Sequence, residues 1–194
     1  MADSLRDRQR GLREDVILEA ARDLLMADGY QKMSMDGLAA RVGIAKMTLY
    51  QHFPSKEALV VAMIVRGMQR TEAALLPVIT SSQPALTRLR TLLATGLDKR
   101  SVFWAIELDL LPGTIHLNPA YQTQYARFTE HWTALISQAK AEGTIDPSLS
   151  TPVLARVLMQ AFQTGYDDLV QSGAASPDEL AHTLLTLLIR GMQG

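Results

Sequence analysis

The sequence of 194 residues contains no cysteine. This absence excludes disulfide bonds, thiolate metal sites and a cysteine nucleophile, and it suits a reducing compartment. No apolar run approaches the roughly 18 residues that a membrane-spanning helix needs. The polar start of the chain, MADSLRDRQRGLRED, also lacks the apolar segment of a secretion signal. We therefore expect a cytoplasmic protein without a membrane partner.

Motifs of catalysis are missing as well. The chain has no glycine-rich phosphate loop, no G-x-S-x-G and no H-E-x-x-H. Its four histidines do not have the spacing of metal ligands: His52, His116, His131 and His182. We expect no enzyme, no metal site and no cofactor.

The composition is that of a folded globular protein, with 47% hydrophobic and 20% charged residues and a formal net charge of −1. Such a balance gives little sign of an extended nucleic-acid surface. Four arginines precede the first expected helix, and they fit either a DNA-contacting arm or a solvated terminus: Arg6, Arg8, Arg10 and Arg13.

Helical periodicity fills nearly the whole chain, and no segment is typical of a strand. A first helix is expected to end at Gly29 and a second to begin at the N-cap Ser34. The third runs from about Ala45 to Phe53, and the fourth should end near Pro77. Later N-terminal signals stand at Asn118-Pro119, Thr151-Pro152 and Ser176-Pro177. The pattern predicts an all-α protein of about nine helices.

Residues 38–53 have the spacing of a helix-turn-helix. Ala39 is small where a second helix crosses closely, and Gly43 can adopt the positive φ of a tight turn. Leu49 can then pack back between the two helices. In DNA-binding proteins the second helix of this motif lies in the major groove.

The third helix has the side chains that such a role requires. Ala45, Leu49 and Phe53 recur every four residues and are expected to face inward. The remaining positions then present donors, an aromatic ring and an apolar side chain to the outside. We assign phosphate contacts to Lys46, Tyr50, His52 and Lys56, and base-edge contacts to Thr48 and Gln51, with Met47 facing directly outward.

The run MSMDGLAARVGIAKMTLYQHFPSKEAL resembles the signature of the TetR family of transcriptional regulators, and the resemblance covers about residues 12–62. It implies an N-terminal three-helix helix-turn-helix domain, in residues 1–56, that binds double-stranded operator DNA. It further implies a larger helical domain, in residues 57–194, that binds a small effector and dimerises. DNA contacts carry over to Ser34, Lys46, Met47, Thr48, Tyr50, Gln51, His52 and Lys56.

Two positions depart from the family pattern. Ile44 stands where a polar cap is common, which leaves the third helix poorly capped. Gly37 lies inside the second helix, where it should destabilise the helix by about 1 kcal/mol relative to alanine.

Most aromatic side chains fall between residues 100 and 170, and they fit either a packed core or an apolar ligand cavity. Glu107 or His116 can supply the polar group that orients a ligand. We predict effector contacts at Trp104, Glu107, Tyr121, Tyr125, Trp132, Met159, Phe162 and Tyr166.

The two C-terminal helices contain more apolar residues than a helix with a single buried face requires. They fit a four-helix interface between two subunits or an internal helix pair. The interface would use Leu180, Leu184, Leu187, Leu188 and Met192 with Val153, Val157, Ala161 and Gly165.

These observations predict a homodimeric, sequence-specific transcriptional regulator. We expect a repressor that a small apolar or aromatic effector releases from its operator. Two alternatives remain open: a DNA-binding dimer without such an effector, acting architecturally or through a protein partner, and a small-molecule carrier that has lost DNA binding.

Overall fold

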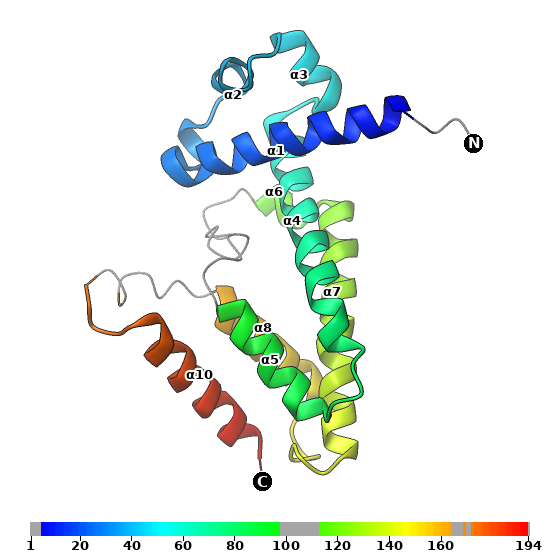
Figure 1. Cartoon of the computed structure of the whole chain (residues 1–194), viewed down its shortest axis with the longest axis vertical. Helices are drawn as coiled ribbons and strands as arrows, with labels where there is room; N and C mark the ends of the chain where they lie inside the picture. Colours follow the sequence, from blue (N-terminus) through cyan, green and yellow to red (C-terminus); the bar gives the residue numbers. More distant parts are fainter. Residues whose placement is uncertain (1–4, 98–112, 164–168, 170–171, 194) are drawn as a thin grey trace. The chain divides into compact units, whose positions relative to one another are not determined.

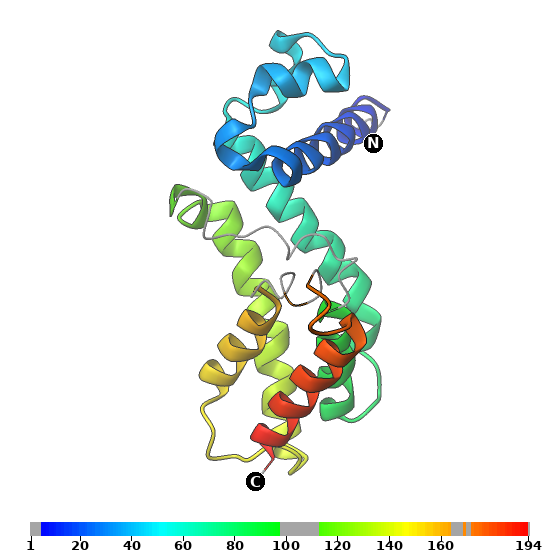
Figure 2. The same ribbon diagram turned by 90° about the vertical axis from the view of Figure 1, so that its left-hand side faces the viewer.

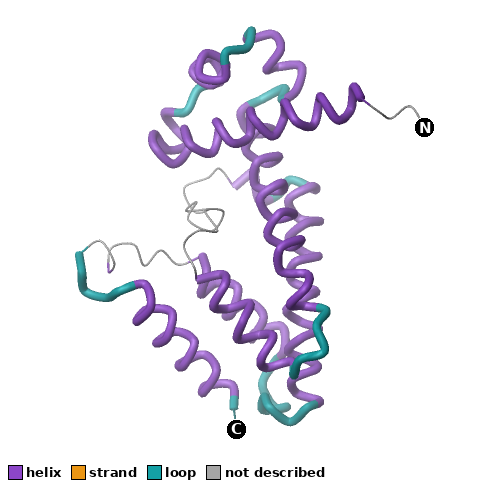
Figure 3. Tube along the Cα trace, viewed as in Figure 1, coloured by secondary structure: helices purple, strands orange, loops and turns teal. Residues whose placement is uncertain are grey.

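The computed structural model describes residues 5–97, 113–163, 169 and 172–193. Helices and their connecting loops account for this described part, and no strand occurs within it (Figure 3). The all-α prediction is confirmed. The described helices are α1 (Leu5–Lys32), α2 (Met35–Val42), α3 (Lys46–His52), α4 (Lys56–Ile79), α5 (Ala85–Leu97), α6 (Gly113–His116), α7 (Pro119–Ala141), α8 (Thr151–Gln163) and α10 (Pro177–Met192).

The described residues form two compact units. The first contains residues 5–67 and 113–122, and the second contains the remainder. Helices α4 and α7 each contribute residues to both units.

Local capping chemistry sets most helix ends. Gly29, at φ 75°, interrupts α1 before its last turn, as expected. Asn118 caps α7 by accepting a hydrogen bond from the Ala120 amide at 3.0 Å. Ser176 and Glu179 form a capping box at the start of α10. Helix α4 continues slightly beyond its expected end, because Pro77 is accommodated in its last turn.

The first unit buries one face of each of its helices. Helix α2 lies against α1 and α3 (Figures 1 and 2). The centre of this core is fully buried and consists of Ile17, Ala21, Leu38, Leu49, Leu59 and Ile64. On α1, Val16 is 56% exposed, whereas its neighbours Ile17 and Leu18 are buried.

In the second unit α5 lies beside both α8 and α10. A backbone hydrogen bond of 2.9 Å, from the Asp146 amide to the Met192 carbonyl, joins the loop after α7 to the end of α10. The apolar core of this unit includes Leu89, Leu92, Leu93, Ile136, Ala139, Leu158 and Ile189.

None of the helices that the structure describes is both long and apolar enough to cross a membrane. Over the same described residues, histidine and acidic side chains nowhere gather into a group of three that could hold a metal ion.

Candidate nucleic-acid interface

The turn between α2 and α3 depends on Gly43. This residue has φ 74° and ψ 33°, the left-handed conformation that side-chain-bearing residues rarely adopt. Its amide donates to the carbonyls of Ala39 and Ala40, and the Ile44 amide donates to Ala39 at 3.0 Å. The last carbonyls of α2 are thereby satisfied, and the chain reverses at once into α3.

The start of α2 is built around Ser34. Its backbone is extended, and its Oγ accepts a hydrogen bond of 3.0 Å from the Gly37 amide. A Cβ placed on Gly37 would lie only 3.0 Å from that Oγ. Gly37 has a low helix propensity, but because it has no Cβ it leaves room for the Ser34 hydroxyl that caps α2.

Helix α3 begins without a side-chain cap. Ala45 is the N-cap residue, in an extended conformation and without a side-chain hydrogen bond. We expected Ala45 to face inward, and this was wrong: the residue is exposed, because it precedes the helix and does not share its periodicity. Leu49 and Phe53 are buried as expected, with 0% and 6% of their surfaces exposed.

The outer face of α3 carries a mixed group of side chains. Met47 is 72% exposed and Tyr50 is 38% exposed, although both could bury apolar surface. Gln51 is also exposed, and Thr48 is half-buried beside them. The methionine and tyrosine side chains of this short helix are therefore accessible to another molecule.

Lys46 forms an ion pair with Asp36, in the first turn of α2. Its Nζ lies 2.7 Å from Oδ1 and 2.8 Å from Oδ2 of that carboxylate. Hydrogen bonding and charge from Asp36 raise the pKa of Lys46. The lysine that is predicted to bind phosphate is therefore already held by an internal anion.

His52 is held by Glu14 of α1. The His52 Nδ1 lies 3.1 Å from Glu14 Oε1, and Arg10 Nε donates to the same oxygen at 3.0 Å. Burial acts to raise the pKa of Glu14, but the hydrogen bonds with His52 and Arg10 outweigh it and lower that pKa. Only 10% of the His52 side chain is exposed, and its DNA contact stays a prediction.

Lys56 lies against an aromatic ring at the start of α4. Its Nζ is 4.2 Å from the centroid of Tyr30, which is within cation–π range. The Tyr30 hydroxyl donates to Glu57 Oε1 at 3.1 Å. Burial, together with the negative charge of Glu57, raises the pKa of Tyr30 to about 12. Tyr30 thus links the end of α1 to the first turn of α4.

The first unit therefore brings all eight predicted DNA-contacting residues onto three neighbouring chain segments. Six lie on α3, Ser34 caps α2, and Lys56 begins α4. Sequence reasoning missed the partners of Lys46, His52 and Lys56, which are Asp36, Glu14 and Tyr30.

The predicted effector contacts are only partly described. Trp104, Glu107 and Tyr166 lie outside the described residues, as does the side chain of Phe162. Tyr121 belongs to the first unit, where its ring packs edge-on against His116 with centroids 5.3 Å apart.

Three predicted contacts, Tyr125, Trp132 and Met159, belong to the second unit. Trp132 and Met159 are buried, with 2% and 1% of their surfaces exposed. The Tyr125 hydroxyl accepts a hydrogen bond of 2.8 Å from Arg156. Thr129 connects two of the positions, since its hydroxyl donates to the Tyr125 carbonyl and lies 3.5 Å from the Met159 sulfur.

A buried carboxylate also occurs in this unit. Glu72 of α4 is 8% exposed and accepts hydrogen bonds from Gln124 at 2.7 Å and Arg127 at 3.2 Å. The His131 Nε2 lies 2.9 Å from its Oε1. Burial acts to raise the pKa of Glu72, but these hydrogen bonds and the Arg127 charge together lower it. Within the described residues the partners of Glu72 are all on α7, so the group ties α4 to α7.

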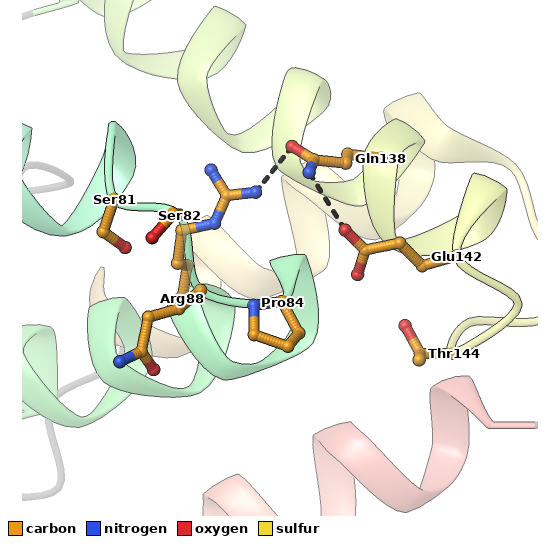
Figure 4. A pocket seen from close by; sticks show the side chains of 8 residues that line it. Ser81, Ser82, Pro84, Arg88, Gln138, Glu142 and Thr144 are labelled. Atoms are coloured by element: carbon orange, nitrogen blue, oxygen red, sulfur yellow. Dashed lines mark hydrogen bonds between the residues drawn. The ribbon is translucent and has the colours of Figure 1, made fainter.

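A polar hollow of about 540 Å³ lies between the α4–α5 loop and the end of α7 (Figure 4). The guanidinium of Arg88 is 7% exposed and donates to the Ile79 carbonyl and to Gln138. Gln138 in turn donates to Glu142, whose other oxygen accepts from the Ala85 amide. Of the predicted effector contacts that the structure describes, none lines this hollow.

Comparison with known proteins agrees with this geometry. Residues 17–63 match the family model described as bacterial regulatory proteins, tetR family. The HTH-type transcriptional regulator UidR of Escherichia coli (strain K12) is 25% identical over 146 residues, which are 74% of each chain.

Solved structures share the fold over nearly the whole chain. FadR from Bacillus subtilis, in complex with stearoyl-CoA, has a TM-score of 0.78 at 16% identity and covers 92% of this chain and 98% of its own. AibR, in complex with isovaleryl coenzyme A and operator DNA, has a TM-score of 0.71 at 21% identity and covers 91% and 98%. In its helix-turn-helix region the chain is thus similar to bacterial regulatory proteins of the tetR family, and over most of its length it shares the fold of solved transcriptional regulators.

Proposed function

We propose that the protein is a homodimeric DNA-binding transcriptional repressor whose residues 1–56 bind operator DNA and whose residues 57–194 bind an effector and dimerise. The observation that carries the proposal is the outer face of α3. This face presents exposed Met47, Tyr50 and Gln51 while Leu49 fixes the helix to the core. A short helix held in this way by the Gly43 turn has the dimensions that fit the major groove.

The roles of the individual side chains follow from their chemistry. Ser34 and Lys46 stand at the first turns of α2 and α3, where hydroxyl, ammonium and free amide groups favour phosphate. Thr48 and Gln51 read base edges, and Gln51 can bind adenine through two hydrogen bonds. Tyr50, His52 and Lys56 complete the contacts to the DNA backbone. Met47 adds an apolar contact in the groove.

Binding by a dimer fits the modest charge of the chain. Two recognition helices on half-sites about one helical turn apart double the phosphate contacts of a protein with few cations. Helices α8 and α10 supply the surface for the second copy, because Val153, Val157 and Leu187 are 59%, 43% and 69% exposed. Leu180, Leu184 and Leu188 are half-buried beside them, and Met192 is buried.

The effector is a small apolar or aromatic molecule bound in the second domain. We assign its contacts to the apolar and aromatic side chains of Tyr125, Trp132 and Met159, of which the last two are buried. Acyl-CoA thioesters are the first probes to test, because two proteins of this fold bind stearoyl-CoA and isovaleryl coenzyme A. Binding shifts α4, which contributes residues to both units, and the two recognition helices then no longer match the operator.

The first test is binding of the purified protein to the DNA upstream of its own gene, measured by fluorescence anisotropy across a salt series. We expect saturable, salt-dependent binding with dimer stoichiometry and at least tenfold preference over a random duplex. Acyl-CoA or an aromatic effector should lower this affinity. Specific binding that no compound alters would favour the dimer without an effector, and absence of binding at low salt would contradict the proposed function.

A further inference from the structure

The contact between Asp36 and Lys46 is far more exposed than the contact between Glu14 and His52. Lys46 is one of the eight predicted DNA-contacting residues, and Asp36 is not. Their side chains are 60% and 65% exposed. His52 and Glu14, by comparison, are 10% and 23% exposed. The Lys46–Asp36 pair can therefore open into solvent without any rearrangement of the core, whereas the His52–Glu14 pair cannot.

The geometry leaves Lys46 little capacity for a second anion. An ammonium group has three N–H donors, and the two oxygens of Asp36 lie 2.7 and 2.8 Å from Nζ. A phosphate that approached Lys46 with the pair intact would meet an almost neutral group and a neighbouring carboxylate of like charge. Asp36 also stands between Ser34 and Gly37, in the first turn of α2, where amide groups favour phosphate. Its charge opposes phosphate at both places.

We propose that Asp36 competes with DNA phosphate for Lys46, and that it thereby limits the electrostatic, sequence-independent part of DNA binding. The consequence is specificity, because base contacts by Thr48 and Gln51 must then supply a larger share of the affinity. A protein of net charge −1 that binds DNA in this way avoids strong attachment to unrelated sequence. This inference rests on the proposed function.

The salt dependence of binding measures the effect. Each phosphate that a cation neutralises contributes about −0.9 to the slope of log K against log salt concentration. Replacing Asp36 by the isosteric, uncharged asparagine frees one lysine per recognition helix. Between 50 and 200 mM salt, the Asp36→Asn variant should lose about 3.5-fold more affinity per subunit than the wild type, or about 12-fold more for a dimer. Below 100 mM salt it should bind both operator and random duplex more tightly.

Two controls separate this mechanism from a general charge effect. Asp28 is an exposed aspartate of α1 that forms no ion pair within the described part of the chain. Asp28→Asn makes the same change in net charge and should leave the salt slope unchanged. In a Lys46→Gln background, Asp36→Asn should no longer steepen the slope, because the competing cation is gone.

The experiment uses full-length protein, anisotropy of labelled operator and random duplexes, and circular dichroism to confirm folding of each variant. A steeper slope in Asp36→Asn alone supports the inference. An equal increase in Asp28→Asn, or an unchanged or shallower slope in Asp36→Asn, overturns it. If the wild-type protein itself fails to bind DNA at low salt, the proposed function fails instead, and the two outcomes are thus distinguishable.

Discussion

The opposing effects at Gly37 make Gly37→Ala an informative substitution. Alanine in a helix interior is more favourable than glycine by about 0.8–1.0 kcal/mol. The new Cβ, however, would stand 3.0 Å from Ser34 Oγ, closer than such contacts normally allow. Ser34 is exposed, so its hydroxyl can rotate away, but the hydrogen bond to the residue 37 amide is then lost. Loss of an N-cap destabilises a helix by typically about 1 kcal/mol.

The two effects nearly cancel, and we expect Gly37→Ala to change the free energy of unfolding by less than about 0.5 kcal/mol. In a Ser34→Ala background the crowding disappears. There the same substitution should raise the free energy of unfolding by its full propensity gain of about 0.8–1.0 kcal/mol. The coupling between the two sites is therefore about 1 kcal/mol.

Urea unfolding of the four proteins, followed by circular dichroism, completes this double-mutant cycle. A gain of about 1 kcal/mol in both backgrounds would mean that the two residues act independently, and the argument from crowding would be refuted. The same proteins test function. Gly37→Ala should weaken operator binding about as much as Ser34→Ala, because both displace the hydroxyl that is proposed to bind phosphate.

Three further predictions concern the core, a buried charge and the dimer. Leu49→Ala, at a fully buried site, should lower the free energy of unfolding by about 2–5 kcal/mol, as measured by urea unfolding. Met47→Ala, at an exposed site, should change the free energy of unfolding by less than about 0.5 kcal/mol. It should instead weaken operator binding, as measured by fluorescence anisotropy. Because folding lowers the pKa of Glu72 from 4.5, the contribution of this carboxylate to stability is present above pH 4.5 and is lost as the pH falls through its pKa in the folded protein. Glu72→Gln should remove this pH dependence from the free energy of unfolding measured between pH 3 and 6. Leu187→Glu should yield monomers in sedimentation velocity, while Leu117→Glu, at a similarly exposed site of the first unit, should remain dimeric. A dimer of unchanged stability in Leu187→Glu would contradict the proposed interface.

Local chemistry made much of the fold predictable from the sequence. The signals at Ser34, Gly43, Asn118 and Ser176 depend only on neighbouring residues, and each marks a helix end in the structure. The helix-turn-helix was predictable for the same reason, since its turn requires one glycine at a fixed distance from Leu49. Ala45 was misassigned because periodicity says where a face lies along a helix and not where the helix begins.

The contacts that hold Lys46, His52 and Lys56 could not be predicted in this way. Glu14 lies 38 positions from His52, and Tyr30 lies 27 from its hydrogen-bond partner Glu57. Such pairs form only when α1, α3 and α4 pack together, and no local pattern in the sequence records them. Even the Lys46–Asp36 pair, 10 positions apart, spans a turn that places two first turns side by side.

The effector site shows a similar limit. Along α7 the aromatic residues Tyr121, Tyr125, Phe128 and Trp132 recur at steps of three and four and so share one face, and three of the four are buried. Periodicity does not reveal what that face packs against. The distribution of these residues between two units, with Tyr121 in the first, follows from tertiary packing alone.

The carboxylate partner of Lys46 also has a consequence for the kinetics of operator search. Long-range attraction accelerates encounter with DNA only when positive charge extends from the surface without nearby compensation. Here the Nζ of Lys46 lies 2.7 Å from Asp36 Oδ1. We therefore expect an association rate constant that depends weakly on ionic strength, and short residence on unrelated sequence. Such a protein finds its operator mainly by repeated three-dimensional encounters, with little sliding along the duplex.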